Sequence, residues 1–467
     1  MHSIYTIFNQ KQLPVWLLFT LAVTLFSACK KEEIKFPTIH PGESTYVQYD
    51  VPFDQVPATS DIVLYEVNLR AFSAAGNLKG VEARLDSIKN LGVNVVWLMP
   101  IYPIGELNAI GSPYAVKDYF KVNPDYGTLE DLRELVKASH QRGMAVMLDW
   151  VGNHTAWDNS WIQTKAWYTQ DASGSIVSPN TWTDVADLNF SSMAMRKEMI
   201  KAMKYWVLEA NVDGYRCDYA EGVPNDFWKQ AIDTLHSIPN RDILMFAEAG
   251  DKSLFSAGFD MTFGWGFYDQ LKGVFQNNRP VSELVSAHSA EYANVPSGDQ
   301  IVRWTTNHDN NATEGTPQTI FNNPQGSMAA FVLTSYMGGV PLLYNGQEVG
   351  CPTQLSFFKG GNTKIDWNIN AGISAEYKKL LGFRQSSNAV RRGSLETFSA
   401  NPDVLAFRRT AGSEEVCVLV NVRATAVNYT LPAALANTSW VNALTGESVA
   451  LGASLSLPAF NYLIIKK

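Results

Sequence analysis

Short apolar runs recur between residues 60 and 345 and alternate with longer amphipathic segments. This alternation is typical of strand and helix units repeated around a parallel sheet. Eight runs fit short buried strands: Ile62 to Val67, Val93 to Met99, Ala145 to Leu148, Val212 to Cys217, Ile243 to Ala247, a short run near Phe259, Ile301 to Trp304 and Val340 to Tyr344. Eight repeats predict an α/β fold of the (β/α)8 barrel type. No glycine-rich dinucleotide or phosphate fingerprint follows the first strand to favour an open doubly wound sheet.

Helical periodicity supports the same interpretation between the strands. Residues Thr128 to Asp131 form a capping-box pattern, and leucine and valine then repeat at helical spacing up to Val136. A second helix is expected from Met193 to Ala210, directly before the fourth strand.

Two segments depart from the barrel pattern. Residues 152–190 are too many for an ordinary loop and are rich in Trp, Asn and Asp, which predicts a small inserted domain after the third strand. After about residue 392 short alternating strands predict a C-terminal antiparallel β-sandwich domain, 395–467. The barrel would then comprise residues 56–151 and 191–394. The clearest strands of the last domain are Val404 to Phe407, Val416 to Asn421, Val427 to Leu431 and Tyr462 to Ile465.

The N-terminus has the pattern of an export signal. Residues 13–28 are apolar, follow Lys11 and are too few for a confident membrane span. The segment ends in Leu-Phe-Ser-Ala-Cys29, which resembles a bacterial lipobox except at Phe26. We therefore predict a signal peptide over 1–28, a lipidated Cys29 with a tether over 29–55, and export to the bacterial outer membrane, on its periplasmic face or the cell surface. A plain secretory signal is the alternative.

The amino-acid composition limits the classes of molecule that the protein is expected to bind. The net charge is -8 without a Lys/Arg-rich run in the mature part, which argues against nucleic acid. Aromatic residues make up 12% of the chain and include 13 Trp, and some stand in loop-like sequence where a ring face suits stacking on neutral sugars. Apart from Cys29, three cysteines remain, at positions 217, 351 and 417. An odd set gives no disulfide framework, so free buried thiols are expected, with a 351–417 pair as the alternative.

The stretch VDGYRCDYAEGV, residues 212–223, places Arg216 and Asp218 on the same face of an apolar strand. In a (β/α)8 barrel the functional residues lie at the C-terminal ends of strands. Those ends also carry Asp149 with Asn153 and His154, then Glu248, and then Asn307-His308-Asp309. Singly, each carboxylate could be a helix cap, a turn residue or half of a structural ion pair. Together, on strands four, five and seven, the three carboxylates predict a polar site.

Four of these segments, "DWVGNH", "GYRCD", "FAEAG" and "TNHD", resemble the short conserved regions of the α-amylase family, glycoside hydrolase family 13. Further similar stretches are "LGVNVVWLMPIYP", "GSPYAVKDY", "DLNF" and "GGVPLLYNGQEVG". The resemblance covers about residues 60–465 and implies a barrel, an inserted domain B and a C-terminal domain C. With the lipobox, the chain resembles the lipoprotein amylases of starch utilisation in Bacteroidetes.

The resemblance implies a role for each matching residue. Asp218 would be the nucleophile, Glu248 the general acid and base, and Asp309 a third carboxylate that binds sugar hydroxyls. Substrate contacts would come from Tyr114, His154, Arg216 and His308, with Asp149 as a supporting residue. Arg216 should favour ionised Asp218, whereas Glu248 must keep a proton and should have a less cationic or more apolar setting. The family retains anomeric configuration, for which the two carboxyl groups lie about 5 to 5.5 Å apart.

Two departures concern the surroundings of the site. Glu221 and Gly222 stand where many α-amylases have a Lys-His pair, which weakens the case for the usual contacts to the sugars beyond the cleaved bond. Asn153 and Asp187 match two calcium ligands of the family, although such a site needs about six oxygens. Four tryptophans of the short insertion, at positions 157, 161, 167 and 182, either line the cleft or fill a small core, and the core is expected for at least two.

These features predict a glycoside hydrolase that cleaves α-1,4-glucosidic bonds of starch, glycogen or maltooligosaccharides. An α-glucan transglycosylase of the same family is the alternative, because a sugar hydroxyl can replace water in the second step. A non-catalytic glycan-binding barrel is a third possibility, but such relatives typically lack one of the three carboxylates.

Overall fold

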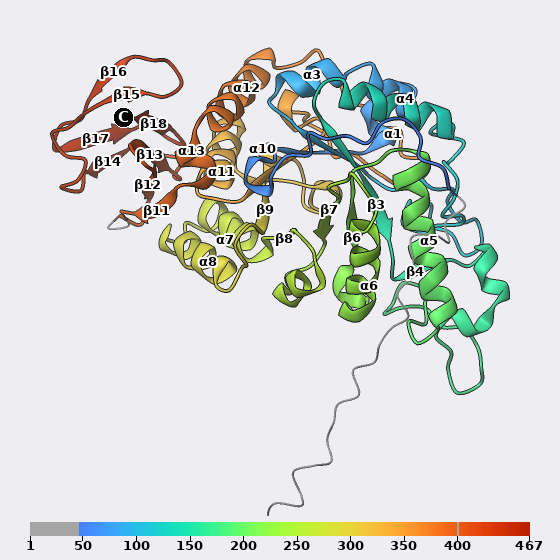
Figure 1. Cartoon of the computed structure of the whole chain (residues 1–467). Coiled ribbons are helices and arrows are strands. Elements are labelled where there is room, and N and C mark those ends of the chain that lie inside the picture. Colours follow the sequence, from blue (N-terminus) through green and yellow to red (C-terminus); the bar gives the residue numbers. More distant parts are fainter. Residues whose placement is uncertain (1–45, 399–400) are drawn as a thin grey trace, which may run out of the picture. The chain divides into compact units, whose positions relative to one another are not determined.

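Eight parallel strands close into a barrel in the computed structural model, which describes residues 46–398 and 401–467 (Figure 1). Around the barrel the strand order is β1-β10-β9-β8-β7-β6-β3-β2, and every neighbouring pair is parallel. The strands are β1 Leu64–Val67, β2 Val95–Leu98, β3 Ala145–Val151, β6 Gly214–Asp218, β7 Leu244–Ala247, β8 Met261–Phe263, β9 Gln300–Trp304 and β10 Val340–Tyr344. The predicted (β/α)8 barrel is confirmed.

The barrel strands are buried almost throughout, which explains their continuous apolar sequences. Their ends differ from the predicted ones by a few residues. The fourth predicted strand, Val212 to Cys217, is observed as β6 Gly214–Asp218, so Asp218 is the last residue of the strand. The strand expected near Phe259 is β8, which starts two residues later.

Helices connect the strands and cover the barrel. They are α1 Leu69–Phe72, α2 Leu78–Glu82, α3 Leu85–Asn90, α4 Leu129–His140, α5 Met193–Glu209, α6 Asn225–His236, α7 Trp265–Gln276, α8 Ser282–Tyr292, α9 His308–Thr313, α10 Pro317–Ile320, α11 Pro324–Tyr336, α12 Ala371–Ser386 and α13 Asn388–Arg392. The predicted capping box of α4 is present: the Thr128 hydroxyl accepts from the Asp131 N–H at 3.2 Å, and the Asp131 carboxylate accepts from the Thr128 N–H at 2.8 Å.

The insertion after β3 contains a two-stranded antiparallel sheet of β4 His154–Ala156 and β5 Val185–Asp187. Trp161 of this segment is buried and contacts the ring of Trp167, whereas Trp182 is 37% exposed. The tryptophans therefore divide between a small core and the surface.

The C-terminal part forms the predicted sandwich of antiparallel sheets. Its core includes Val404, Leu419, Tyr429 and Trp440. Two strands that the sequence suggested, β12 Val404–Ala411 and β13 Glu414–Asn421, are longer than expected. The larger sheet has the order β11-β12-β13-β18-β15-β16 and the smaller pairs β14 with β17, with β11 Ser394–Thr397, β14 Val427–Thr430, β15 Ser439–Asn442, β16 Ser448–Ala450, β17 Ser454–Leu457 and β18 Tyr462–Lys466.

Cys217, Cys351 and Cys417 are buried and free, which confirms the first of the two alternatives for them. The signal peptide, the lipid on Cys29 and most of the tether lie outside the described residues and stay predictions. Within the described residues, no helix has both the length and the apolar character needed to cross a membrane.

Arg423 joins the C-terminal domain to the barrel helices. The residue is 8% exposed, and its guanidinium contacts the Asp403 carboxylate at 2.7 Å and the carbonyl oxygens of Val274 and Arg279 at 2.7 and 2.8 Å. Removing the guanidinium would leave these buried acceptors without a partner.

We therefore expect Arg423→Met to lower the free energy of unfolding by about 2 to 4 kcal/mol, measured by urea or thermal denaturation. The control is Arg408→Met, because Arg408 pairs with Glu396 and Glu415 at a more exposed position and should lose less than about 1 kcal/mol. Equal losses in the two variants would contradict this role of Arg423.

Candidate active site

The C-terminal ends of the barrel strands bring charged residues from distant parts of the chain to one rim. Asp149 of β3 lies beside Arg216 of β6 in the strand register, and Cys217 lies beside Ala247 of β7. The residues that follow, Asp218 and Glu248, are therefore neighbours. Parallel strands of a closed barrel all end on the same side, so sequence distance does not separate these side chains.

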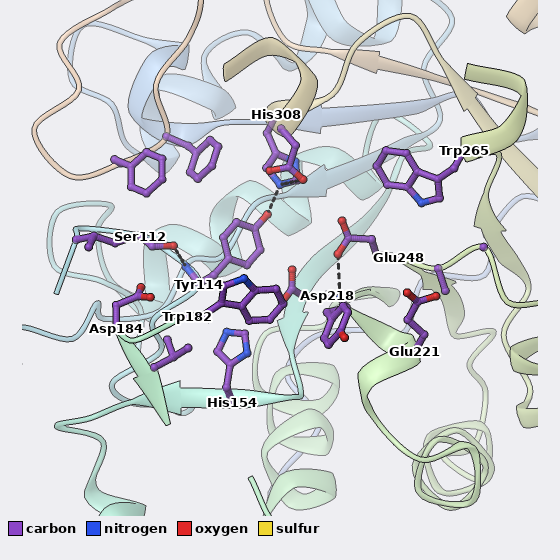
Figure 2. A pocket seen from close by; sticks show the side chains of 18 residues that line it. Ser112, Tyr114, His154, Trp182, Asp184, Asp218, Glu221, Glu248, Trp265 and His308 are labelled. Carbon is purple, nitrogen blue, oxygen red and sulfur yellow. Dashed lines mark hydrogen bonds and ion pairs between the residues drawn. The ribbon is translucent and has the colours of Figure 1, made fainter. Parts of the chain in front are cut away.

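A cavity of about 480 Å³ opens at this rim (Figure 2). Its lining includes six of the seven residues predicted to act on the sugar: Tyr114, His154, Asp218, Glu248, His308 and Asp309. The seventh, Arg216, lies beneath them and is fully buried. The structure thus brings all seven together, and the cavity is polar at its floor and aromatic around its sides.

Arg216 contacts three carboxylates at once. Its Nη1 lies 2.8 Å from Asp149 Oδ1 and 3.1 Å from Asp218 Oδ1, and its Nη2 lies 2.9 Å from Glu248 Oε2. The supporting position of Asp149 is as expected. The less cationic setting predicted for Glu248 is wrong, because Glu248 and Asp218 share the same guanidinium.

The net influence on Asp218 also differs from the expected one. Burial raises the pKa of Asp218 well above its ordinary value, the negative charge of Glu248 raises it further, and Arg216 only partly opposes them. Burial and the neighbouring negative charge thus favour the protonated form of Asp218 in the free protein.

His308 is a second cation in the site. Its Nδ1 lies 2.5 Å from Glu66 Oε1, and its Nε2 lies 3.4 Å from Asp309 Oδ2. Burial alone would lower the pKa of His308, but the carboxylates of Asp309 and Glu66 outweigh burial and raise it to about 9. The imidazole is therefore charged at neutral pH.

Tyr114 and His154 differ from His308 in having no charge at neutral pH. Burial lowers the pKa of His154 to about 4, so its ring is neutral. The Tyr114 hydroxyl lies 2.8 Å from His308 Nε2 and donates to Asp149 Oδ2 at 3.2 Å, which fixes its ring against the cavity. A neutral imidazole and a fixed phenol ring suit contacts with sugar hydroxyls and a sugar face.

The turn after β6 holds Glu248 from a second direction. The Tyr219 N–H donates to Glu248 Oε2 at 2.8 Å, and the Ala220 N–H donates to the Glu248 carbonyl oxygen at 3.1 Å. The carboxyl group is thus fixed by a guanidinium and by a backbone amide.

Several residues of the site were not predicted. Glu66 is fully buried behind the cavity lining and is the next-to-last residue of β1, in LYEVN, where a carboxylate in an apolar strand was an available signal. Aromatic residues complete the sides of the cavity, and nothing in their sequence distinguishes them from core aromatics. They are Tyr219 after β6, Trp265 at the start of α7, and Phe357 and Phe358 after β10, with Trp182 as the tryptophan of the insertion that lines the cavity.

The two predicted calcium ligands lie close together, but two residues supply fewer oxygens than a calcium site needs. The Leu188 N–H donates to the Asn153 carbonyl oxygen at 3.2 Å, and Asp187 lies beside His154 in the β4–β5 pair. Among the described residues, Asp187 has no ion pair and no group of three or more His, Cys, Asp or Glu could hold a metal ion. A half-buried carboxylate without a cation fits a calcium ligand, while the remaining oxygens would have to come from backbone and water.

Comparison with known proteins gives matches over nearly the whole described chain. The family model "Alpha amylase, catalytic domain" matches residues 53–173 and 163–392, and "Maltogenic Amylase, C-terminal domain" matches 397–464. Alpha-amylase 2 of Dictyoglomus thermophilum is 26% identical over 80% of this chain and 68% of its own.

Two solved structures have similar folds. An alpha-amylase from Lactobacillus plantarum is 29% identical, with a TM-score of 0.77, over 87% of this chain and 99% of its own. A noncanonic maltogenic alpha-amylase from Thermotoga neapolitana is 25% identical, with a TM-score of 0.78, over 88% of this chain and 99% of its own.

The charged state of His308 should make stability depend on pH. Because the pKa of His308 is raised by folding, its stabilising effect is complete below about pH 6.5 and is lost as the pH rises through about 9. We expect Glu66→Gln to remove one of the two charges that raise this pKa. The alkaline fall of the melting temperature should then begin at lower pH than in the wild type.

The matched control is Glu291→Gln, since Glu291 pairs with Arg303, which does not titrate in this range. That variant should lose stability equally at all pH values between 6.5 and 9. An unchanged pH profile in Glu66→Gln would contradict the assignment of charge to His308.

Proposed function

Because the chain belongs to the α-amylase family of glycoside hydrolases, family 13, we propose that it cleaves α-1,4-glucosidic bonds with retention of configuration. The substrates would be starch, glycogen or maltooligosaccharides. The observation that carries the proposal is the contact of Asp218 and Glu248 with one guanidinium at the floor of one cavity.

In the first step Asp218 attacks C1 of the bound glucose unit while Glu248 gives its proton to the glycosidic oxygen. The C1–O bond breaks, the leaving sugar departs with a free hydroxyl, and an ester joins C1 to Asp218. In the second step Glu248 takes a proton from water, whose oxygen attacks C1 and releases Asp218 as a carboxylate. The two groups therefore act in opposite protonation states, with Asp218 ionised and Glu248 protonated at the start of the first step.

The other cavity residues bind the glucose unit. Asp309, whose side chain is 45% exposed, and charged His308 offer an acceptor and a donor to sugar hydroxyls. Neutral His154 offers a second donor, and the Tyr114 ring supports the sugar face. The two reacting carboxyl groups should lie about 5 to 5.5 Å apart, which stays a prediction.

Transfer to a sugar instead of water is the second candidate. The same ester forms in both reactions, and the aromatic sides of the cavity favour it by offering surface for a second sugar. The third candidate, a non-catalytic glycan-binding barrel, has less support because all three carboxylates are present at the cavity.

We also propose that Asn153 and Asp187 contribute oxygens to a calcium ion that ties the insertion to the barrel. The ion would supply structural stability and no chemical step.

A product analysis on amylose, pullulan and maltooligosaccharides tests the substrate and the mode of attack. Asp218→Asn should lower kcat by at least about a thousandfold while oligosaccharide binding, measured by calorimetry, persists. Glu248→Gln should lower kcat by about 10²- to 10⁴-fold. The carboxylate control is Asp251→Asn, because Asp251 caps a short turn outside the cavity. Full activity in Asp218→Asn would refute the proposed function.

Calcium can be tested by its effect on unfolding. A chelator should lower the melting temperature of the wild type, and added calcium should restore it, since a ligand that binds only the folded state stabilises that state. Asp187→Asn should make the chelator ineffective. A wild-type melting temperature that ignores both chelator and calcium would count against the ion.

A further inference from the structure

Tyr219, directly after Asp218, has a backbone conformation that aromatic residues avoid. Its φ is 42° and its ψ is 49°, in the left-handed region. Every other described non-glycine residue with positive φ is Asn or Asp, except Phe460. A Cβ is disfavoured in this region, and where such strain persists the surroundings fix it, often at a functional site.

Both the backbone and the ring of Tyr219 have defined partners. Its N–H binds Glu248 Oε2, and its carbonyl oxygen accepts from the Gly222 N–H at 2.9 Å. The hydroxyl accepts from Asn180 at 3.4 Å. A Cβ on Gly222 would lie 2.3 Å from Cε1 of the Tyr219 ring, so glycine at 222 leaves the room that this ring needs.

The Tyr219 ring continues into the insertion through Trp182. The two ring centroids are 5.0 Å apart with an interplanar angle of 75°, and Trp182 lies 5.7 Å from His154 at 69°. We call these three residues, His154, Trp182 and Tyr219, the aromatic wall. All three line the cavity, and Trp182 keeps 37% of its surface exposed. Apolar ring surface is therefore open to a ligand.

The aromatic wall extends past the point of bond cleavage. In the proposed reaction the attacked glucose lies among Tyr114, His154 and His308, and the leaving sugar lies beyond Glu248. Figure 2 shows Glu221 and Trp265 on the Glu248 side of the pocket, away from Tyr114. Tyr219, bonded to Glu248, stands at that end of the wall.

The chemistry at that end favours stacking over polar contacts. Glu221 lines the cavity, and as a carboxylate it accepts hydrogen bonds but carries no positive charge. Gly222 has no side chain at all. Ring faces gain energy from the apolar face of a sugar in addition to burial of their area, and they bind it without fixing one hydroxyl pattern.

We propose that Tyr219 and Trp182 determine specificity by forming the surface on which the sugar of the leaving group stacks, an inference that rests on the proposed function. The same surface holds an incoming sugar for transfer. In that reaction the acceptor hydroxyl oxygen attacks C1 of the Asp218 ester, Glu248 takes the hydroxyl proton, and the C1–Asp218 bond breaks to leave a carboxylate.

The test compares two substrates that differ only beyond the cleaved bond. Maltotetraose has a leaving sugar, whereas α-maltosyl fluoride loses fluoride ion and places nothing on the surface. In Trp182→Ala and Tyr219→Ala, the ratio of kcat/KM for maltotetraose to kcat/KM for the fluoride should fall about three- to tenfold. The yield of longer products with added maltose should fall with it. Tyr219→Ala keeps the backbone N–H that binds Glu248.

Two controls separate stacking from general damage. Tyr219→Phe keeps the ring and loses only the hydroxyl, so its ratio should stay near that of the wild type. Trp167→Ala removes a tryptophan of the same insertion whose ring contacts Trp161 outside the cavity. The ratio of the two kcat/KM values in this variant should also stay near that of the wild type. Trp182→Phe provides a milder variant if an alanine variant fails to fold.

The outcomes distinguish the two proposals. A wild-type protein that turns over neither substrate would end the proposed function itself. Turnover of the fluoride that depends on Asp218, with an unchanged ratio in both alanine variants, would overturn the inference alone. An equal loss on both substrates would also overturn it, because the rings would then serve the bound glucose and not its neighbour.

Discussion

One buried guanidinium contacts three of the carboxylates at the functional rim of the barrel. Arg216 has no exposed surface, contacts Asp149, Asp218 and Glu248, and lies under the rings of Trp97 and Tyr114 at 5.0 and 5.7 Å. Because buried carboxylates are costly without a partner, the arrangement of these acids depends on this cation. Charged His308, between Glu66 and Asp309, offsets a further part of the negative charge.

The closed barrel brings these charged groups together, and the loops add the surface that surrounds them. Strand register alone places Asp149 beside Arg216 and Asp218 beside Glu248, whereas the insertion after β3 contributes His154 and Trp182. The rigid part of the fold thus supplies the reacting groups, and the less regular part supplies the surface around them. This division explains how one barrel can keep its chemistry while its neighbouring binding surfaces vary.

The sequence predicted the barrel, the insertion and the C-terminal sheets from local patterns, namely apolar runs, a long interruption and short alternating strands. Polar strand ends indicated most residues of the site, whereas Tyr114 and the role of each residue came from the resemblance to the α-amylase family. The sequence did not predict that Arg216 would contact Glu248, since that contact is set by the side-to-side register of β6 and β7. It missed Glu66, whose partner His308 lies 242 residues further along the chain, so that only the closed barrel brings the two together. The short polar strands β15, β16 and β17 escaped detection because few of their residues are buried.

Two of the buried cysteines, Cys217 and Cys417, can report local opening of the two domains in which they lie. Burial raises the pKa of Cys217 well above its ordinary value and that of Cys417 to about 12, so neither thiol is a nucleophile at neutral pH while it remains covered. Cys217 belongs to the barrel strand β6 and Cys417 to strand β13 of the C-terminal sandwich. An alkylating reagent would therefore modify Cys217 only when the barrel opens locally, and Cys417 only when the C-terminal domain does. The order in which the two cysteines are alkylated, followed by peptide mass spectrometry, would show which of the two domains opens more readily.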